Sequence, residues 1–392
     1  SHELWDETVE YVGVYEASFE EIRELALEPT LALHLEPDDL SDFRITNDPR
    51  HELTLVSSVI RWRVHPVNGR LPHAFRKLAP ELWIAAAEWD GDRAGEVVLA
   101  SVGLARHATR VPGVMSWLTA TSMQSEASDR AALVIAIAPG LLREEHLAPV
   151  QSEIEGFDPL ADLHGAFEDD LAWETHDMRA WRLMLKLADD AESAEMLRDA
   201  ELNDLEGLLA NYRRLVDAAQ WAIEGETFAR YTDPGVPMPT RPEGDLWFRP
   251  IDAQFVESAM SLQPRLVTNA WLAEMRRRGA IVGLAAERYR LASGRPPTDQ
   301  AELVSSGLLD RPVRSIFSQA ELGIAAEDTG TVVYDPGPDE RDDGGGALLE
   351  AYEVWPWMTG RRTPPRGDVR VWSTSLEWRL GAEARRLPEP ED

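Results

Sequence analysis

The side chains best suited to hold a metal ion lie in the segment YDPGPDERDDGGG. Its four aspartates, spaced by prolines and glycines, are Asp335, Asp339, Asp342 and Asp343. Calcium takes roughly six to eight oxygen ligands from carboxylates and backbone carbonyls on a tightly turning loop. The segment therefore predicts a calcium site, although its spacing is not that of an EF-hand. A plain acidic loop, in which Asp and Gly serve turn geometry, is the competing interpretation.

A second cluster carries two histidines and five acidic residues, which are His164, Glu168, Asp169, Asp170, Glu174, His176 and Asp177. Residues three or four apart share a helix face, so His164 and Glu168 could ligate a transition metal together. This cluster predicts, as an alternative function, a metal-dependent enzyme using residues 164–177. It matches neither HExxH nor the Glu-x-x-His of diiron bundles. The competing interpretation is the exposed polar face of an amphipathic helix.

Composition excludes several classes of protein. The formal net charge of −31 repels phosphate backbones and anionic lipids, so we expect no nucleic-acid binding. Cysteine is absent, which rules out disulfides, thiol catalysis and cysteine-ligated zinc. That absence fits a protein exported to an oxidising space, and it fits a cysteine-poor cytosolic protein nearly as well. No P-loop, GxGxxG or GxSxG motif occurs.

No apolar run is long enough to span a membrane, so we expect no transmembrane segment in this sequence. The sequence begins SHELWDE, without a signal peptide. A membrane anchor upstream of this start is compatible with that beginning. Our expectation for localisation is the periplasm or cell envelope.

Hydrophobic periodicity divides the chain into four parts. Residues 1–72 form an acidic segment that we expect to pack on the following domain. Residues 73–231 carry apolar residues three or four apart with charges opposite, which predicts a helical bundle. Residues 232–250 hold five prolines and predict a linker. Residues 251–392 begin with a long helix and continue with the strand-like runs TVVY and DVRVWST, which predicts an α+β domain.

The runs AAERYRLASGRPPTDQAELVSSGLL (285–309) and TVVYDPGPDERDDGGG (331–346) resemble the C-terminal part of type II secretion major pseudopilins. In that family a helix ends in a Tyr-x-Leu…Gly-Arg-Tyr-Pro-Thr-like segment. A Leu-Val helix, strands and a glycine- and aspartate-rich loop follow. The residues that match in type and order are Tyr289, Leu291, Gly294, Arg295, Pro297, Thr298, Leu303, Val304, Gly337, Pro338 and Asp339.

This resemblance implies a small domain of one helix and an antiparallel sheet, with a loop that can bind calcium. The whole chain also resembles large, mostly uncharacterised, membrane-anchored bacterial proteins. In those proteins a helical region similar to residues 110–190 is followed by a pseudopilin-like C-terminal part. Two features depart from the pseudopilins. A polar chain and a helical domain replace the hydrophobic N-terminal helix on which pseudopilus assembly depends, and residues 347–392 extend beyond the usual end.

The tail adds a basic, aromatic patch to an acidic chain, formed by Trp355, Trp357, Arg361 and Arg362. Such residues are typical of protein interfaces, and equally of a thin aromatic core. We therefore expect a mainly α protein with a bundle-like domain and a small pseudopilin-like α+β domain. The function that we expect is a non-enzymatic, extracytoplasmic structural or protein-binding component of an envelope-associated assembly, with the pseudopilin-like part as docking module.

Overall fold

The computed structural model describes residues 2–28, 70–170, 251–327, 330–339, 341–345, 348–349, 351–358 and 365–375, with a few positions between 172 and 228. The described chain is mainly helical and ends in a three-stranded antiparallel sheet packed against one long helix, which confirms the predicted fold class. The predicted linker at 232–250 and the segment 29–69 lie outside the described residues.

The N-terminal part consists of helix α1 (His2–Val14), helix α2 (Glu16–Leu27) and a helix over residues 70–87. Helix α2 crosses α5 (Gly91–Thr109) very closely, because a Cβ at Gly103 would lie only 2.2 Å from the carbonyl oxygen of Ala26. The fully buried Glu81 forms ion pairs with Arg23 of α2 and Arg93 of α5. These contacts tie the N-terminal helices to the rest of the helical part.

Alanine, valine and glycine form the buried side of α5, which allows close packing against α6 (Val114–Ile137). Helix α5 begins at the cap Asp90, whose carboxylate accepts the N–H of Arg93 at 3.0 Å. Helix α6 ends before Pro139-Gly140, as the sequence predicts. Helix α7 (Glu144–Glu155) then packs on α5 and a further helix covers 159–170.

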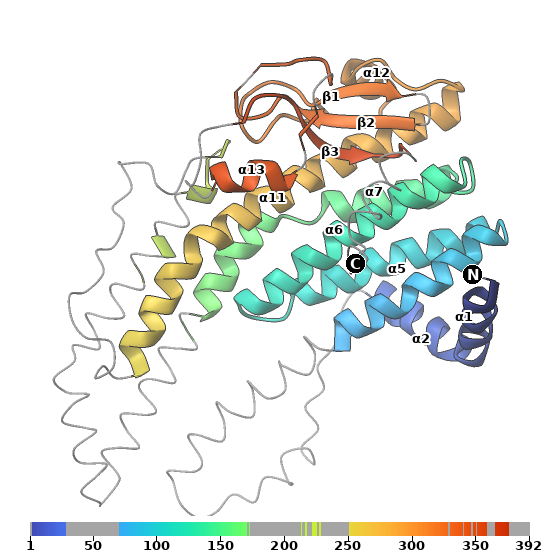
Figure 1. The fold of residues 1–392 in the computed structure, drawn as a ribbon, viewed down its shortest axis with the longest axis horizontal. Coiled ribbons are helices and arrows are strands. Elements are labelled where there is room, and N and C mark those ends of the chain that lie inside the picture. Colours follow the sequence, from blue (N-terminus) through green and yellow to red (C-terminus); the bar gives the residue numbers. More distant parts are fainter. Residues whose placement is uncertain are drawn as a thin grey trace, which may run out of the picture.

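Helix α11 (Ile251–Ser293) lies between the sheet and the helical part (Figure 1). One of its faces contacts α6 and α7, and another contacts the second and third strands. Arg288 pairs with Glu144 and donates to Gln151 at 2.9 Å, which joins α11 to α7. One continuous cluster of buried apolar residues includes members from both parts.

The sheet has the order β1-β2-β3, with β1 (Gly323–Glu327), β2 (Gly330–Asp335) and β3 (Val369–Ser373). Both neighbouring pairs are antiparallel. Two glycines of α11 let β3 approach: a Cβ at Gly283 would lie 2.2 Å from the ring of Trp372, and one at Gly279 would lie 2.6 Å from Val371. The short helices α12 (Gln300–Ser305) and α13 (Ala351–Met358) complete this C-terminal unit.

None of the described helices contains a stretch that is long and apolar enough to cross a membrane. This observation agrees with the expectation from the sequence.

Candidate functional sites

The aspartate- and glycine-rich loop folds back over the sheet on the face that carries Tyr334. A Cβ at Gly345 would lie 3.2 Å from the Tyr334 ring and 3.5 Å from the side chain of Ala325. On the same face, a Cβ at Gly323 would overlap the Tyr334 ring. The loop therefore covers the aromatic side chain of β2, and its glycines make that close approach possible.

Asp335 is fully buried at the end of β2, and its oxygens face a neighbouring turn. Its carboxylate accepts the hydroxyl of Ser315 at 2.6 Å, the N–H of Ile316 at 3.1 Å and the N–H of Gly337 at 3.0 Å. Burial raises the pKa of Asp335, and these three donors oppose the rise. The side chain thus fixes the turn at 315–316 to the start of the loop.

Asp368, which the sequence analysis did not single out, anchors the other side of the loop. It is fully buried and accepts the N–H groups of Asp343 at 3.2 Å and Gly345 at 2.7 Å. Burial raises its pKa, and the nearby carboxylates of Asp342 and Asp343 add to that rise. The only sequence signal for this role is its place directly before a strand, facing a glycine-rich loop.

The three remaining aspartates of the predicted calcium site also bond to neighbouring groups of the protein. Asp339 accepts the N–H of Gly367 at 3.3 Å, and Asp342 accepts that of Gly344 at 2.8 Å. Asp343 pairs with Arg341 at 3.4 Å. Across the described part of the chain, no three carboxylate or imidazole groups converge closely enough to hold a metal ion. Calcium binding by this loop stays a prediction, and it would require these oxygens to turn away from their present donors.

We expect EDTA to leave the melting temperature unchanged, because the buried carboxylates of this loop are already satisfied by backbone donors. Differential scanning calorimetry with EDTA or calcium measures this directly. A melting temperature that falls in EDTA would show that the loop needs a metal to fold. A rise with calcium that is lost in Asp342→Asn would support the calcium prediction.

The described members of the 164–177 cluster serve packing contacts. Glu168 forms an ion pair with Arg213, and the carboxylate of Asp170 accepts the N–H of Val114 at 3.3 Å, at the start of α6. Burial raises the pKa of Asp169. Nδ1 of His164 is buried without a hydrogen-bond partner among the described residues. Glu174, His176 and Asp177 lie outside the described residues.

The tryptophans of the tail lie on α13. The Trp357 ring packs against Phe228 and Phe317, with centroids 5.7 Å apart in each pair, and Phe228 in turn contacts Trp271 of α11. Trp357 therefore belongs to an aromatic cluster that fastens α13 to α11. The side chain of Trp355 and both arginines, Arg361 and Arg362, lie outside what the structure describes.

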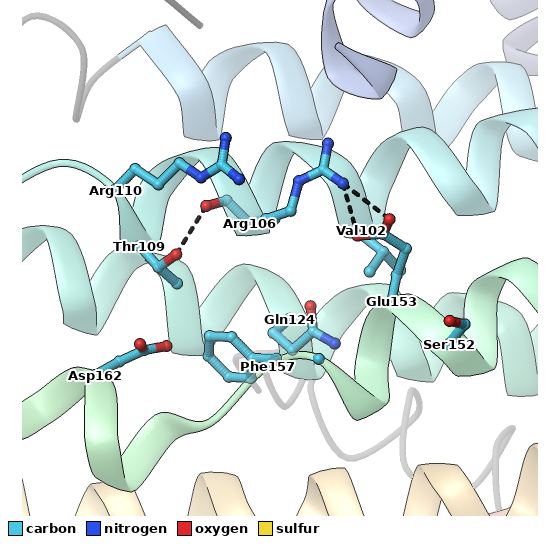
Figure 2. A pocket seen from close by; sticks show the side chains of 10 residues that line it. Val102, Arg106, Thr109, Arg110, Gln124, Ser152, Glu153, Phe157 and Asp162 are labelled. Carbon is cyan, nitrogen blue, oxygen red and sulfur yellow. Dashed lines mark hydrogen bonds and ion pairs between the residues drawn. The ribbon is translucent and has the colours of Figure 1, made fainter. Parts of the chain in front are cut away.

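The helical part contains a cavity of about 340 Å³ that the sequence did not suggest. Four elements line it: α5, α6, the C-terminal end of α7 and the segment that follows α7. Figure 2 shows Arg106 of α5 and Arg110, directly after α5, at one side of the cavity, and Phe157 and Asp162 at the other. Arg106 forms two contacts of 2.8 Å to the carboxylate of Glu153.

Two donors of this cavity have no acceptor among the described residues. Gln124 is only 4% exposed, and its Nε2 is buried without a partner. The Nε of Arg106 is also buried and unpartnered. Buried donors without acceptors are rare in folded proteins, because each one costs about 1–3 kcal/mol. Both donors belong to residues that line the cavity, but the two nitrogen atoms themselves are closed to solvent.

Asp162 faces the same cavity. Burial, together with the charge of Asp158, raises the pKa of Asp162 to about 6. Its carboxylate forms no hydrogen bond or ion pair with any other side chain of the described region. Ionising Asp162 therefore costs more free energy in the folded protein than in the unfolded chain.

Replacing Asp162 with asparagine is expected to stabilise the protein at pH 7.5. The folded protein keeps a proton on Asp162 up to about pH 6, whereas the unfolded chain releases it near its ordinary value of 3.8. The protonated carboxyl of Asp162 therefore makes its full contribution to the free energy of unfolding below about pH 4, and this contribution is lost as the pH rises through about 6. Solvent still reaches this carboxyl, so we expect a gain of about 1 kcal/mol. Urea unfolding between pH 4 and 8 tests this, and equal pH profiles for both proteins would contradict it.

The cavity escaped the sequence analysis because its residues come from elements far apart in the chain and form no local motif. No family model, no curated protein and no solved structure matches this chain.

Proposed function

We propose that this chain is a non-enzymatic, extracytoplasmic protein-binding component of a cell-envelope assembly. Its C-terminal unit, α11 with the sheet, is the docking module, and the edge strand β1 is the surface to which a partner adds a strand. The observation that carries this proposal is the open backbone edge of β1. The resemblance to pseudopilins and the cysteine-free composition support the envelope location.

The two edges of the sheet differ. At the β3 edge, the N–H of Leu349 donates to the backbone carbonyl of Asp368 at 2.7 Å and the N–H of Arg370 donates to that of Leu349 at 2.9 Å, so a neighbouring segment covers part of that edge. At the other edge, β1 pairs with β2 on one side, and no backbone hydrogen bond joins its other side to another described segment. Exposed edge strands of this kind recruit extended segments of other proteins.

The register shows which backbone groups of β1 point outward. Thr331 pairs with Ala326, yet the N–H and C=O of Thr331 bond to Thr374 on the side of β3. In an antiparallel pair, two directly opposite residues either bond to each other through both backbone groups, or both residues point these groups away from each other. Thr331 and Ala326 form a pair of the second kind. Ala326 therefore offers its N–H and C=O to an added strand. Ala326 is also exposed to solvent.

The substitution Ala326→Pro tests this proposal. Proline removes the outward N–H without removing a bond to β2, so the sheet should remain while strand addition is blocked. In gradient sedimentation of envelope extracts from the source cells, we expect the wild type in a large assembly and the variant released from it. Circular dichroism checks that the variant stays folded. A wild type that sediments as a free chain, or a folded variant that stays in the assembly, would refute the proposal.

The described contacts of Glu168 and Asp170 are structural, so no observation favours the alternative of a metal-dependent enzyme at 164–177.

A further inference from the structure

We propose that the contact between α2 and α5 is a proton-sensitive latch, in which uptake of a proton by His107 releases α2 from the helical part. This inference concerns the N-terminal helices and is independent of the docking role proposed for the sheet.

The first argument is the place of His107 in the fold. It lies on α5 one helical turn after Gly103, where the backbone of α2 crosses at Ala26. The side chain is only 3% exposed, and both ring nitrogens are closed to solvent without a hydrogen-bond partner among the described residues. The carbonyls of Leu25 and Ala26 lie near the ring, although neither is placed to accept a hydrogen bond from it. The end of α2 therefore helps to keep water away from this imidazole.

The second argument is the cost of a charge at this position. Burial lowers the pKa of His107 below its ordinary value of 6.5, and the positive charges of Arg106 and Arg110 lower it further. When α2 moves away, water reaches the ring and the imidazole takes up a proton more readily. The closed contact is thus fully stable above about pH 6.5 and loses free energy as the pH falls below that value.

The carboxylates on α2 and α7 near this contact do not compensate such a charge. Glu28 of α2 is exposed, and its backbone carbonyl accepts a hydrogen bond from Arg106 at 2.9 Å. Glu153 of α7 is held by Arg106 at 2.8 Å. Both groups are therefore engaged with the arginine beside His107 or directed to solvent.

The remaining neighbours of α5 supply few charges at this end. The helix over 70–87 begins with the exposed residues Arg70 and His73, and α6 carries no charged residue between positions 114 and 125. Asp162 lies in the cavity with Arg106, and its pKa of about 6 makes it the second group that titrates in this range. Any test of the latch must therefore separate His107 from Asp162.

Release of α2 has a defined structural consequence. The helix is held by the ion pair of Arg23 with Glu81, by the bond from Arg106 and by the buried side chain of Phe19. Helices α1 and α2 lie on the side of the helical part away from the sheet (Figure 1), so their movement leaves the sheet in place. Opening the latch would expose Phe19 and the glycine surface of α5.

The test measures the distance between two spin labels. The chain has no cysteine, so cysteines introduced at Ser18 of α2 and Met115 of α6, both exposed, carry the only labels. We expect one narrow distance distribution at pH 7.5. At pH 5.5, above the ordinary range of carboxyl groups, a population with a longer distance should increase about fivefold.

Two neutral replacements, His107→Leu and His107→Gln, should keep the distribution of pH 7.5 at both pH values. His164→Leu, which removes another histidine with a buried and unpartnered Nδ1, is the matched control and should respond to pH like the wild type. Asp162→Asn should also respond like the wild type. Circular dichroism at both pH values confirms that each variant is folded. A wild type without the longer distance at pH 5.5, or a response that persists in a folded His107 variant, would refute the proposal. A response that is lost in Asp162→Asn would assign the effect to Asp162 and refute it as well.

Discussion

Gly283→Ala is expected to lower the free energy of unfolding by about 3 kcal/mol. The new methyl group would lie 2.2 Å from the Trp372 ring, and β3 would have to move away from α11. Because alanine is the better helix former, the loss would be due to the helix–sheet contact alone. Urea unfolding followed by tryptophan fluorescence measures the effect.

The matched control is Gly165→Ala, also within a helix. A Cβ at Gly165 meets no atom within 4 Å, so the substitution should stabilise the protein by about 1 kcal/mol through helix propensity. Equal effects at the two glycines would mean that the sheet does not pack on α11 as described.

Asp335→Ala is expected to cost about 4 kcal/mol, because it leaves the Ser315 hydroxyl and the N–H groups of Ile316 and Gly337 without an acceptor in a buried place. Asp335→Asn keeps one acceptor oxygen and should cost less. Thermal and urea unfolding of both variants provide the comparison.

Asp342→Ala is the control from the same loop. Asp342 is exposed, and its carboxylate accepts the N–H of Gly344 and the hydroxyl of Tyr334, so its loss should cost about 1 kcal/mol, well below that of Asp335. If Asp342→Ala lowers the free energy of unfolding as much as Asp335→Ala does in metal-free buffer, Asp335 is not the residue that anchors the loop.

The helices were predictable because they repeat apolar residues with helical spacing. The spacing of Trp271, Met275, Val282, Ala285 and Tyr289 predicts one face of the long helix; the first four are buried and Tyr289 is half-buried. The strands β2 and β3 were predictable from their β-branched residues. In contrast, β1 has the sequence GIAAE, whose alanines and glycine carry no strand signal, and its pairing with β2 defines it.

The sequence could not show which polar residues share a space. Asp335 is only four residues from Asp339 in the sequence, yet the fold turns it toward Ser315 and brings Asp368 to the loop instead. Likewise, Gln124 and Asp162 meet at one cavity only because α6 and the segment after α7 pack against α5. Such contacts depend on helix packing, and residue type alone does not encode them.

The central claim, that the C-terminal unit docks a partner through β1, is tested most directly by site-specific photo-crosslinking in the source cells. A photoreactive amino acid replaces Ala326 in one version of the chain and Met115, which is 64% exposed on α6, in another. We predict a discrete crosslinked protein from position 326 that is absent from position 115. No adduct at 326, or the same adducts at both positions, would contradict the claim.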